Sequence, residues 1–259
     1  MQNNIIRKRT WAYPLSYFIL VFISILPLYT DKPYLPENTQ DVLISLFKIA
    51  GDPFIIYAPL FHAATFVMVI LIVFIPEKMG RVAAGYMGIN YLVIAITQTM
   101  GQTQEYGFVL HTGGVIVYVL LGIVWLSVAY KRDLLIPKIE LKIYHYGFIL
   151  LALLAFWAPY KVIDETVLPH FDPILLLTSS DFGMSYCFTT PIFLLLLILV
   201  YPGVNAFAYR ITAFNGFIYG LFNLTHWFNE DTQWMGVLHL PLLVISIYAL
   251  LLVRNKDKN

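Results

Sequence analysis

The sequence has little charge and almost no cysteine. Only 12% of its 259 residues are charged and its net charge is +1, whereas a soluble domain carries about 25% charged residues. The single cysteine, Cys187, excludes an internal disulfide framework, a CxxC redox pair and a cysteine-based zinc site. The near-zero net charge gives no electrostatic basis for binding nucleic acid. These shortages exclude a soluble enzyme and a nucleic-acid-binding protein.

Hydrophobic residues make up most of the chain. They account for 59% of it, and the mean hydropathy is +0.75. One core of a domain this size cannot bury so much apolar surface, so lipid must solvate much of it. The sequence therefore predicts an integral membrane protein whose principal partner is the lipid bilayer, in the cytoplasmic membrane if the source is prokaryotic.

Apolar stretches of the length that crosses a bilayer, about 17–25 residues, occur eight times in the chain. Residues 41–50 are too short to cross, and their apolar positions follow a helical spacing, which predicts a short interfacial helix. The fold class that we expect is all-α, a polytopic membrane protein with eight transmembrane helices, at residues 11–29, 54–75, 81–100, 107–130, 143–159, 183–201, 207–227 and 234–253.

The loops predict the orientation of these spans. With the N-terminus in the cytoplasm, only Lys32, Lys48 and Lys161 lie outside, so 13 of the 16 basic residues lie inside. The positive-inside rule then places both termini in the cytoplasm. The basic run Arg7-Lys8-Arg9 precedes a span without a cleavage site, so we expect that span to be retained. Of the 15 acidic residues, 11 fall on the outer side.

Matching residues at an offset of about 128 predict an internal repeat, although two apolar sequences can also align by chance. Each copy holds four spans, an even number, so the copies have the same orientation and form parallel repeats, residues 1–135 and 136–259. The matched positions are Gly88 with Gly216, Tyr91 with Tyr219, Leu110-His111 with Leu238-His239, Gln98 with His226 and, at offset 129, Asp52 with Asp181 and Tyr57 with Tyr186.

The repeat predicts a shared polar site near the outer boundary. If the halves face each other, they bring two matched sets around one central cavity. His62 and His226 lie in the same outer part of the chain, and we expect them to belong to the same ligand-binding site. Charged and imidazole groups in a membrane are costly unless satisfied, so they indicate function by default. The predicted ligand-binding residues of the two sets are Asp52, Tyr57 and His111 in the first half, and Asp181, Tyr186 and His239 in the second.

Several kinds of chemistry are compatible with these residues. Two histidines and two aspartates could complete a metal shell, but no HExxH or HxxxH spacing occurs, so we predict neither a metal nor a cofactor. A His–Asp pair could perform acid–base chemistry, although no residue is identified as catalytic. The histidines could also only hydrogen-bond neighbouring helices and stabilise the bundle.

One family resembles parts of the chain. The runs Leu26-Pro27-Leu28-Tyr29-Thr30-Asp31 and Gly51-Asp52-Pro53 are similar to the EXPERA domain, the four-span module of the sigma-2 receptor and the emopamil-binding sterol isomerase. The run His239-Leu240-Pro241 resembles part of its fourth span. The resemblance implies a cavity for a lipid-like molecule, with Asp31 and Asp52 as structural or ligand-facing acids. The family's intramembrane glutamate is absent, and Phe61-His62 stands near its place.

The leading functional hypothesis is an integral membrane protein that binds a lipid-like or hydrophobic small molecule in a polar-capped cavity in its outer half. One alternative is a small proton-coupled secondary transporter that uses the same His/Asp site. Another is a non-catalytic membrane assembly or sensory partner. A transporter needs polar residues that continue inward, and residues 115–121 and 242–247 offer almost none.

Overall fold

The computed structural model describes residues 12–164 and 166–256. Trp11, at the start of the first expected span, lies outside these residues. The same is true of four basic residues and one acidic residue that bear on the expected orientation, Arg7, Lys8, Arg9, Lys258 and Glu165.

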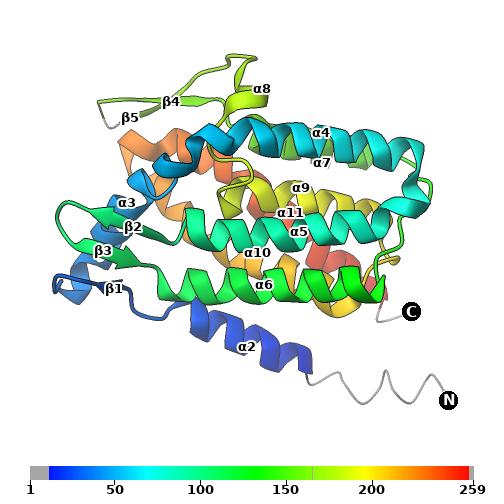
Figure 1. The fold of residues 1–259 in the computed structure, drawn as a ribbon, viewed down its shortest axis with the longest axis horizontal. Helices are drawn as coiled ribbons and strands as arrows, with labels where there is room; N and C mark the ends of the chain where they lie inside the picture. Colours follow the sequence, from blue (N-terminus) through cyan, green and yellow to red (C-terminus); the bar gives the residue numbers. More distant parts are fainter. Residues whose placement is uncertain (1–11, 165, 257–259) are drawn as a thin grey trace.

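From residue 12 to residue 131, the chain folds into five α-helices, with short strands and 3-10 turns between them (Figure 1). Its elements in chain order are α2 (Ala12–Ser24), β1 (Tyr29–Thr30), η1 (Pro36–Asn38), α3 (Thr39–Ile49), η2 (Asp52–Tyr57), α4 (Ala58–Phe74), α5 (Pro76–Thr97), β2 (Met100–Thr103), β3 (Gly107–Leu110) and α6 (Thr112–Lys131).

The second half contains four long helices and one short one. Its elements are α7 (Ile143–Trp157), β4 (Tyr160–Ile163), β5 (Thr166–Pro169), α8 (Leu175–Thr178), α9 (Tyr186–Val200), α10 (Ala206–Phe222), η3 (Asn223–Phe228), η4 (Glu230–Thr232) and α11 (Gln233–Lys256). Each of the eight apolar segments expected from the sequence overlaps one of the longer helices, and α3 overlaps the expected short helix.

Four helical segments are long and apolar enough to cross a membrane, at Pro36–Phe74, Pro76–Thr97, Thr112–Lys131 and Glu230–Arg254. The first of these includes η1, α3 and η2 as well as α4. Helices α2, α7 and α9 are apolar but shorter. Large apolar side chains also stand exposed on the helices, including Phe18 at 71%, Val73 at 70% and Leu150 at 67%. Contiguous exposed apolar surface of this kind suits lipid contact, and the fold is that of a membrane protein.

The fold is mostly helical, but some connections between the helices contain β-strands. The expectation of an all-α protein was wrong for these connections. β2 and β3 form a hairpin, β1 pairs with β3, and β4 pairs with β5 in a second hairpin. Both hairpins turn through a residue with positive φ, Gly107 at 71° and Asp164 at 47°. β3 lies inside the expected fourth span, because its apolar alternation is too short to separate from the helix that follows.

The helices run side by side, and their two ends differ (Figure 1). One end carries α3, the strands and the η3–η4 segment; we call it the hairpin end. The opposite end carries the turn between α4 and α5 and the α6–α7 and α9–α10 connections; we call it the basic end. Its cations include Lys78, Arg81, Lys131, Arg132 and Arg210.

Backbone hydrogen bonds join the two halves at the basic end. Leu135 N donates to Gly203 O at 2.7 Å, and Asn205 N donates to Asp133 O at 3.0 Å. The Asn205 side chain also donates to Asp133 Oδ2 at 3.2 Å. The α6–α7 and α9–α10 connections therefore satisfy each other's backbone groups, as buried loops must.

Polar side chains of α5 hold the start of α9. Asn90 donates to Gly183 O at 3.1 Å and Thr97 donates to Met184 O at 2.8 Å. Gln98 Oε1 accepts from Tyr186 N at 2.8 Å. The Tyr186 N–H is a group that α9 cannot satisfy itself at its first turn, and the two carbonyls belong to the segment just before the helix. The polar residues of α5 thus serve as interhelical hydrogen-bonding groups.

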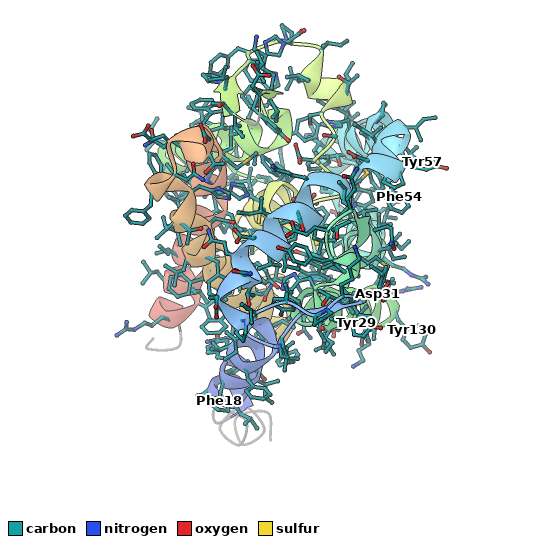
Figure 2. The ribbon with its side chains drawn as sticks, turned by 90° about the vertical axis from the view of Figure 1, so that its left-hand side faces the viewer. Phe18, Tyr29, Asp31, Phe54, Tyr57 and Tyr130 are labelled. Atoms are coloured by element: carbon teal, nitrogen blue, oxygen red, sulfur yellow. The ribbon has the colours of Figure 1, made fainter. Side chains whose placement is uncertain are left out.

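A small second core lies at the hairpin end, separate from the main core of the bundle. Its buried members come from α3 and from the strand segments beneath it (Leu28, Val42, Leu46, Ala50, Tyr106 and Val109). Figure 2 views this end and shows α3 crossing it. Helix α3 buries one face here, so it covers the end of the first half.

Candidate functional site

A shallow cleft lies at the hairpin end, between the end of α10 and the start of α11. It has an empty volume of about 140 Å³, part of which is open to the surroundings. Its polar groups come from Asn223 and His239, and two glycines lie beside them. The lining residues are Gly220, Asn223, Leu224, Gly236, His239, Leu240 and Leu243.

His239 is the central polar residue of this cleft. Its Nδ1 lies 2.7 Å from Met235 O, one turn earlier in α11. A carbonyl can only accept, so Nδ1 carries the proton and Nε2 is the acceptor of the neutral ring. The ring packs edge-on against Phe188 of α9, with centroids 5.2 Å apart. The helix and the phenylalanine therefore fix both the tautomer and the orientation of this imidazole.

His226 stacks on His239 from the 3-10 segment η3. The two ring centroids are 5.3 Å apart, and the planes differ by 20°. Partial burial lowers the pKa of His226 from its usual value. Two stacked imidazoles repel each other when both are charged, so the stacking disfavours protonation of both rings.

Asn223 connects the cleft to α9. Its side-chain nitrogen donates to Cys187 Sγ at 3.1 Å. The two glycines allow the neighbouring chains to approach closely: a Cβ at Gly220 would lie 2.9 Å from the Leu243 backbone, and one at Gly236 would lie 3.0 Å from the Trp227 indole nitrogen. The cleft therefore depends on glycine at both positions.

The cleft presents neutral polar groups in an apolar wall. Its imidazole and amide can donate and accept hydrogen bonds, while three leucines and two glycines supply apolar contact. None of its lining residues is charged. Within residues 12–164 and 166–256, no group of three His, Cys, Asp or Glu side chains could hold a metal ion. The chemistry of the cleft suits a neutral polar group attached to an apolar body.

The structure places the repeat-related His111 differently. His111 precedes α6 and is buried, and its ring lies against Phe47 of α3 and Tyr219 of α10, at centroid distances of 6.1 and 6.5 Å. In the described part of the chain, no hydrogen bond joins His111 to His239 or to Asp52. The structure therefore does not bring the two expected polar sets together by direct bonds.

The first expected set is dispersed in other ways too. Asp52 belongs to the 3-10 helix η2 and is exposed. Tyr57 is 55% exposed, and Figure 2 shows it at the edge of the bundle, pointing away from it. Asp31 is exposed and accepts from Phe108 N at 3.1 Å, so it stabilises the β2–β3 hairpin.

The second expected set is divided between a loop and the bundle centre. Asp181 Oδ2 accepts from the Tyr160 hydroxyl at 2.7 Å. Burial raises the pKa of Asp181 to about 6, and the Tyr160 hydrogen bond opposes that shift. Tyr186 is fully buried and stacks on Tyr118 with centroids 4.9 Å apart. Neither residue lines the cleft around His239.

His62 is also buried, away from the cleft. Its Nε2 lies 3.1 Å from both the carbonyl oxygen and the hydroxyl of Ser179. Phe156 and Phe182 pack against its ring at 4.6 and 5.1 Å. This contact joins α4 to the segment after α8, so His62 has a packing role in the structure.

Only part of the cleft was predicted from the sequence. His226 and His239 were predicted as ligand-binding residues, but Phe188, Gly236 and the contact between Asn223 and Cys187 were not. A usable signal was present, because Asn223 and His226 are three residues apart, as are Gly236 and His239, which places each pair on one helical face. The packing of α9 against these faces depends on tertiary structure and has no local signal.

Comparison with known proteins adds no relative. No protein-family model, no curated protein and no solved structure matches the chain. The resemblance to the EXPERA family therefore stays a prediction, and function has to be argued from the cleft itself.

Proposed function

We propose that the chain is an eight-span membrane protein made of two parallel four-helix repeats, with both termini in the cytoplasm. The order of the long helices supports the repeat, because α2, α4, α5 and α6 in the first half correspond to α7, α9, α10 and α11 in the second. The basic residues gather at one end of the bundle, which supports a cytoplasmic location of that end.

Two matched glycines support the same proposal. Gly88 of α5 packs against α6, where a Cβ would lie 2.9 Å from Leu126 N. Gly216, its counterpart in α10, packs against Leu242 and Ser246 of α11. Small residues let membrane helices approach closely. The same helix pair is thus closely packed at the corresponding glycine in each half.

We further propose that the cleft between α10 and α11 binds the polar end of an amphiphilic, lipid-like molecule from the outer half of the membrane. The observation that carries this proposal is the location of a neutral imidazole and an amide in an open apolar cleft at the hairpin end. Exposed apolar side chains continue from it along both helices, including Leu221, Phe222 and Val244. These could contact the apolar body of the ligand.

The shape of the cleft determines which part of a ligand it could contact. Its space of about 140 Å³ is partly open to the surroundings, so the cleft is a shallow recess at the surface and not an enclosed pocket. It could contact a small headgroup such as a hydroxyl, amide or glycerol, with the rest of the molecule in the bilayer.

The test is lipid binding by the purified protein. We expect native mass spectrometry to find bound lipid, and neutral-headgroup lipids such as diacylglycerol or monoacylglycerol to raise the melting temperature as RT ln(1 + [L]/Kd) requires. A cleft variant, H239A with N223L, should lose this shift. H111A is the matched control and should retain it. Equal shifts in both variants would remove the cleft from the proposal.

A further inference from the structure

The centre of the bundle contains a cluster of buried polar side chains that is separate from the cleft. Its members come from five helices, α5, α6, α9, α10 and α11, where the two halves of the chain meet. They are Tyr91, Tyr118, Tyr186, Thr190, Asn215, Tyr219 and Ser246, and none is more than 8% exposed. We call this group the central polar cluster.

The tyrosine rings of the cluster pack on one another across the two halves. Tyr186 stacks on Tyr118, with centroids 4.9 Å apart and planes 13° apart. Tyr91 and its repeat-related residue Tyr219 both contact Tyr186, at 5.9 and 5.3 Å. This packing explains how the rings are buried, but it does not satisfy their hydroxyl groups.

Most of the polar atoms in the cluster have no hydrogen-bond partner. Tyr91 and Thr190 share one hydrogen bond of 3.3 Å. The hydroxyls of Tyr186 and Ser246 and both polar atoms of the Asn215 amide are buried without one. Each unsatisfied buried group costs about 1–3 kcal/mol. The lipid around the bundle contains no water that could bond to these groups instead.

Two of the unsatisfied groups lie close to each other. Asn215 and Thr190 are the polar neighbours of the Tyr186 hydroxyl, although no direct bond to it has acceptable geometry. A molecule placed between the Tyr186 hydroxyl and the Asn215 amide could bond to both. Ser246 lies against Gly216, the next residue of α10.

We propose that the central polar cluster binds ordered water. The groups that face one another are an amide and hydroxyls, which both donate and accept, and no member of the cluster carries a charge to balance an ion. Buried water typically makes about three hydrogen bonds to otherwise unsatisfied groups. The geometry thus favours a neutral guest with donor and acceptor capacity, and water has both in the smallest volume.

The cluster also approaches the hairpin end. The Tyr219 ring lies between Tyr118, at 5.7 Å, and His111, at 6.5 Å. His111 is 7% exposed at the start of α6. Tyr219 therefore connects the central polar cluster with a residue at the hairpin end. This inference does not depend on ligand binding in the cleft.

The first test is hydroxyl-radical labelling of the intact protein in nanodiscs, with the radicals generated from water by X-rays. Bound water produces radicals beside the groups that hold it, so we expect buried Tyr186 to be labelled several-fold faster than Trp125. Trp125 is equally buried, intrinsically more reactive, and its indole is satisfied by Thr212 at 3.0 Å. A Tyr186 rate no higher than that of Trp125 would overturn the proposal.

The second test is the sign of one stability change. If the cluster is dry, N215L removes two unsatisfied atoms and raises the melting temperature; if water is bound, N215L removes its hydrogen bonds and lowers it. We expect a lower melting temperature and slower labelling of Tyr186 in N215L. A higher melting temperature would contradict bound water, and the labelling of wild-type protein decides the question if N215L does not fold.

Discussion

His111 and His239 occupy matched positions in the sequence and are about equally buried, at 7% and 9% exposed, yet different parts of the fold bury them. Helix α3 and the three-stranded sheet cover His111, and Phe47 lies against its ring. Phe188 and the stacked ring of His226 cover His239 instead, and His239 lines the cleft. Helix α3 therefore buries His111 away from the cleft, whereas His239 is buried by residues that lie at or beside it.

The largest expected effect on stability comes from a substitution in helix α3, which packs over His111. Leu46 of α3 is fully buried in the small core of the hairpin end. We expect L46A to lower the free energy of unfolding by about 3–4 kcal/mol, because it leaves a cavity. Its second effect should be faster carbethoxylation of His111 by diethyl pyrocarbonate, with the rate at His239 unchanged. Equal changes at both histidines would show that α3 does not protect His111 specifically.

The matched aspartates give the next largest effect. The pKa of Asp181 is raised by burial to about 6, from an ordinary value of 3.8. The folded protein therefore binds the proton more tightly, and its stability should fall by about 2–3 kcal/mol as the pH rises from 4 through 6. Unfolding by titration with SDS at several pH values measures how the free energy of unfolding changes with pH. D181N should lose this pH dependence.

D52N is the control for that experiment, because the exposed Asp52 carboxylate is the repeat-related group and makes no hydrogen bond within the described residues. We expect its pH slope to equal that of the wild type. The lowered pKa of His226 has the opposite effect, because protonation below pH 6.5 opposes folding. Both variants retain His226, so the difference between D181N and D52N gives the contribution of Asp181 to the pH dependence of stability.

The two histidines themselves should differ by a smaller amount. H239A removes the bond to Met235 O and the contact with Phe188, which should cost about 1–2 kcal/mol of stability. It should also abolish stabilisation by neutral-headgroup lipids. H111A should cost stability without affecting the lipid shift, as melting curves with and without lipid would show. If H111A, and not H239A, lost the rise in melting temperature with added lipid, the binding histidine would be His111.

The smallest effect is expected at Asp31, an exposed acid beside the β2–β3 hairpin. D31A removes the acceptor of Phe108 N at the hairpin, which should cost about 0.5–1 kcal/mol. D31N retains an acceptor and should cost less. Neither variant should change lipid binding. A loss of lipid binding in D31N would support the ligand-facing role that the family resemblance implies for this acid.

The long helices were predictable from the sequence, because each follows from a continuous apolar stretch. α3 was equally visible, since Val42 and Leu46 are four residues apart and lie on one helical face. The strands were not, because β1 has two residues and the other four strands have four each. Their pairing depends on partners up to 81 residues apart, such as Tyr29 and Leu110.

The candidate site was predictable only in part. His226 and His239 stand out as polar residues in an apolar chain, and both lie at or beside the cleft. Their matched partners follow from the repeat, but the repeat contains no information about α3, which covers His111. The burial of Tyr186 was also not predictable, because it depends on side chains from α5, α6 and α10 that meet only in the folded bundle.

The hydrogen bonds from α5 to the start of α9 have a consequence for biosynthesis. Asn90 and Thr97 leave the ribosome long before their acceptors at Gly183 and Met184 have been translated. In a nascent chain that ends after α6, the Asn90 amide therefore has no acceptor from the second half, and such a group is costly in lipid. Translation of the segment before α9 supplies those acceptors, so the early spans reach their final state only when the late ones arrive.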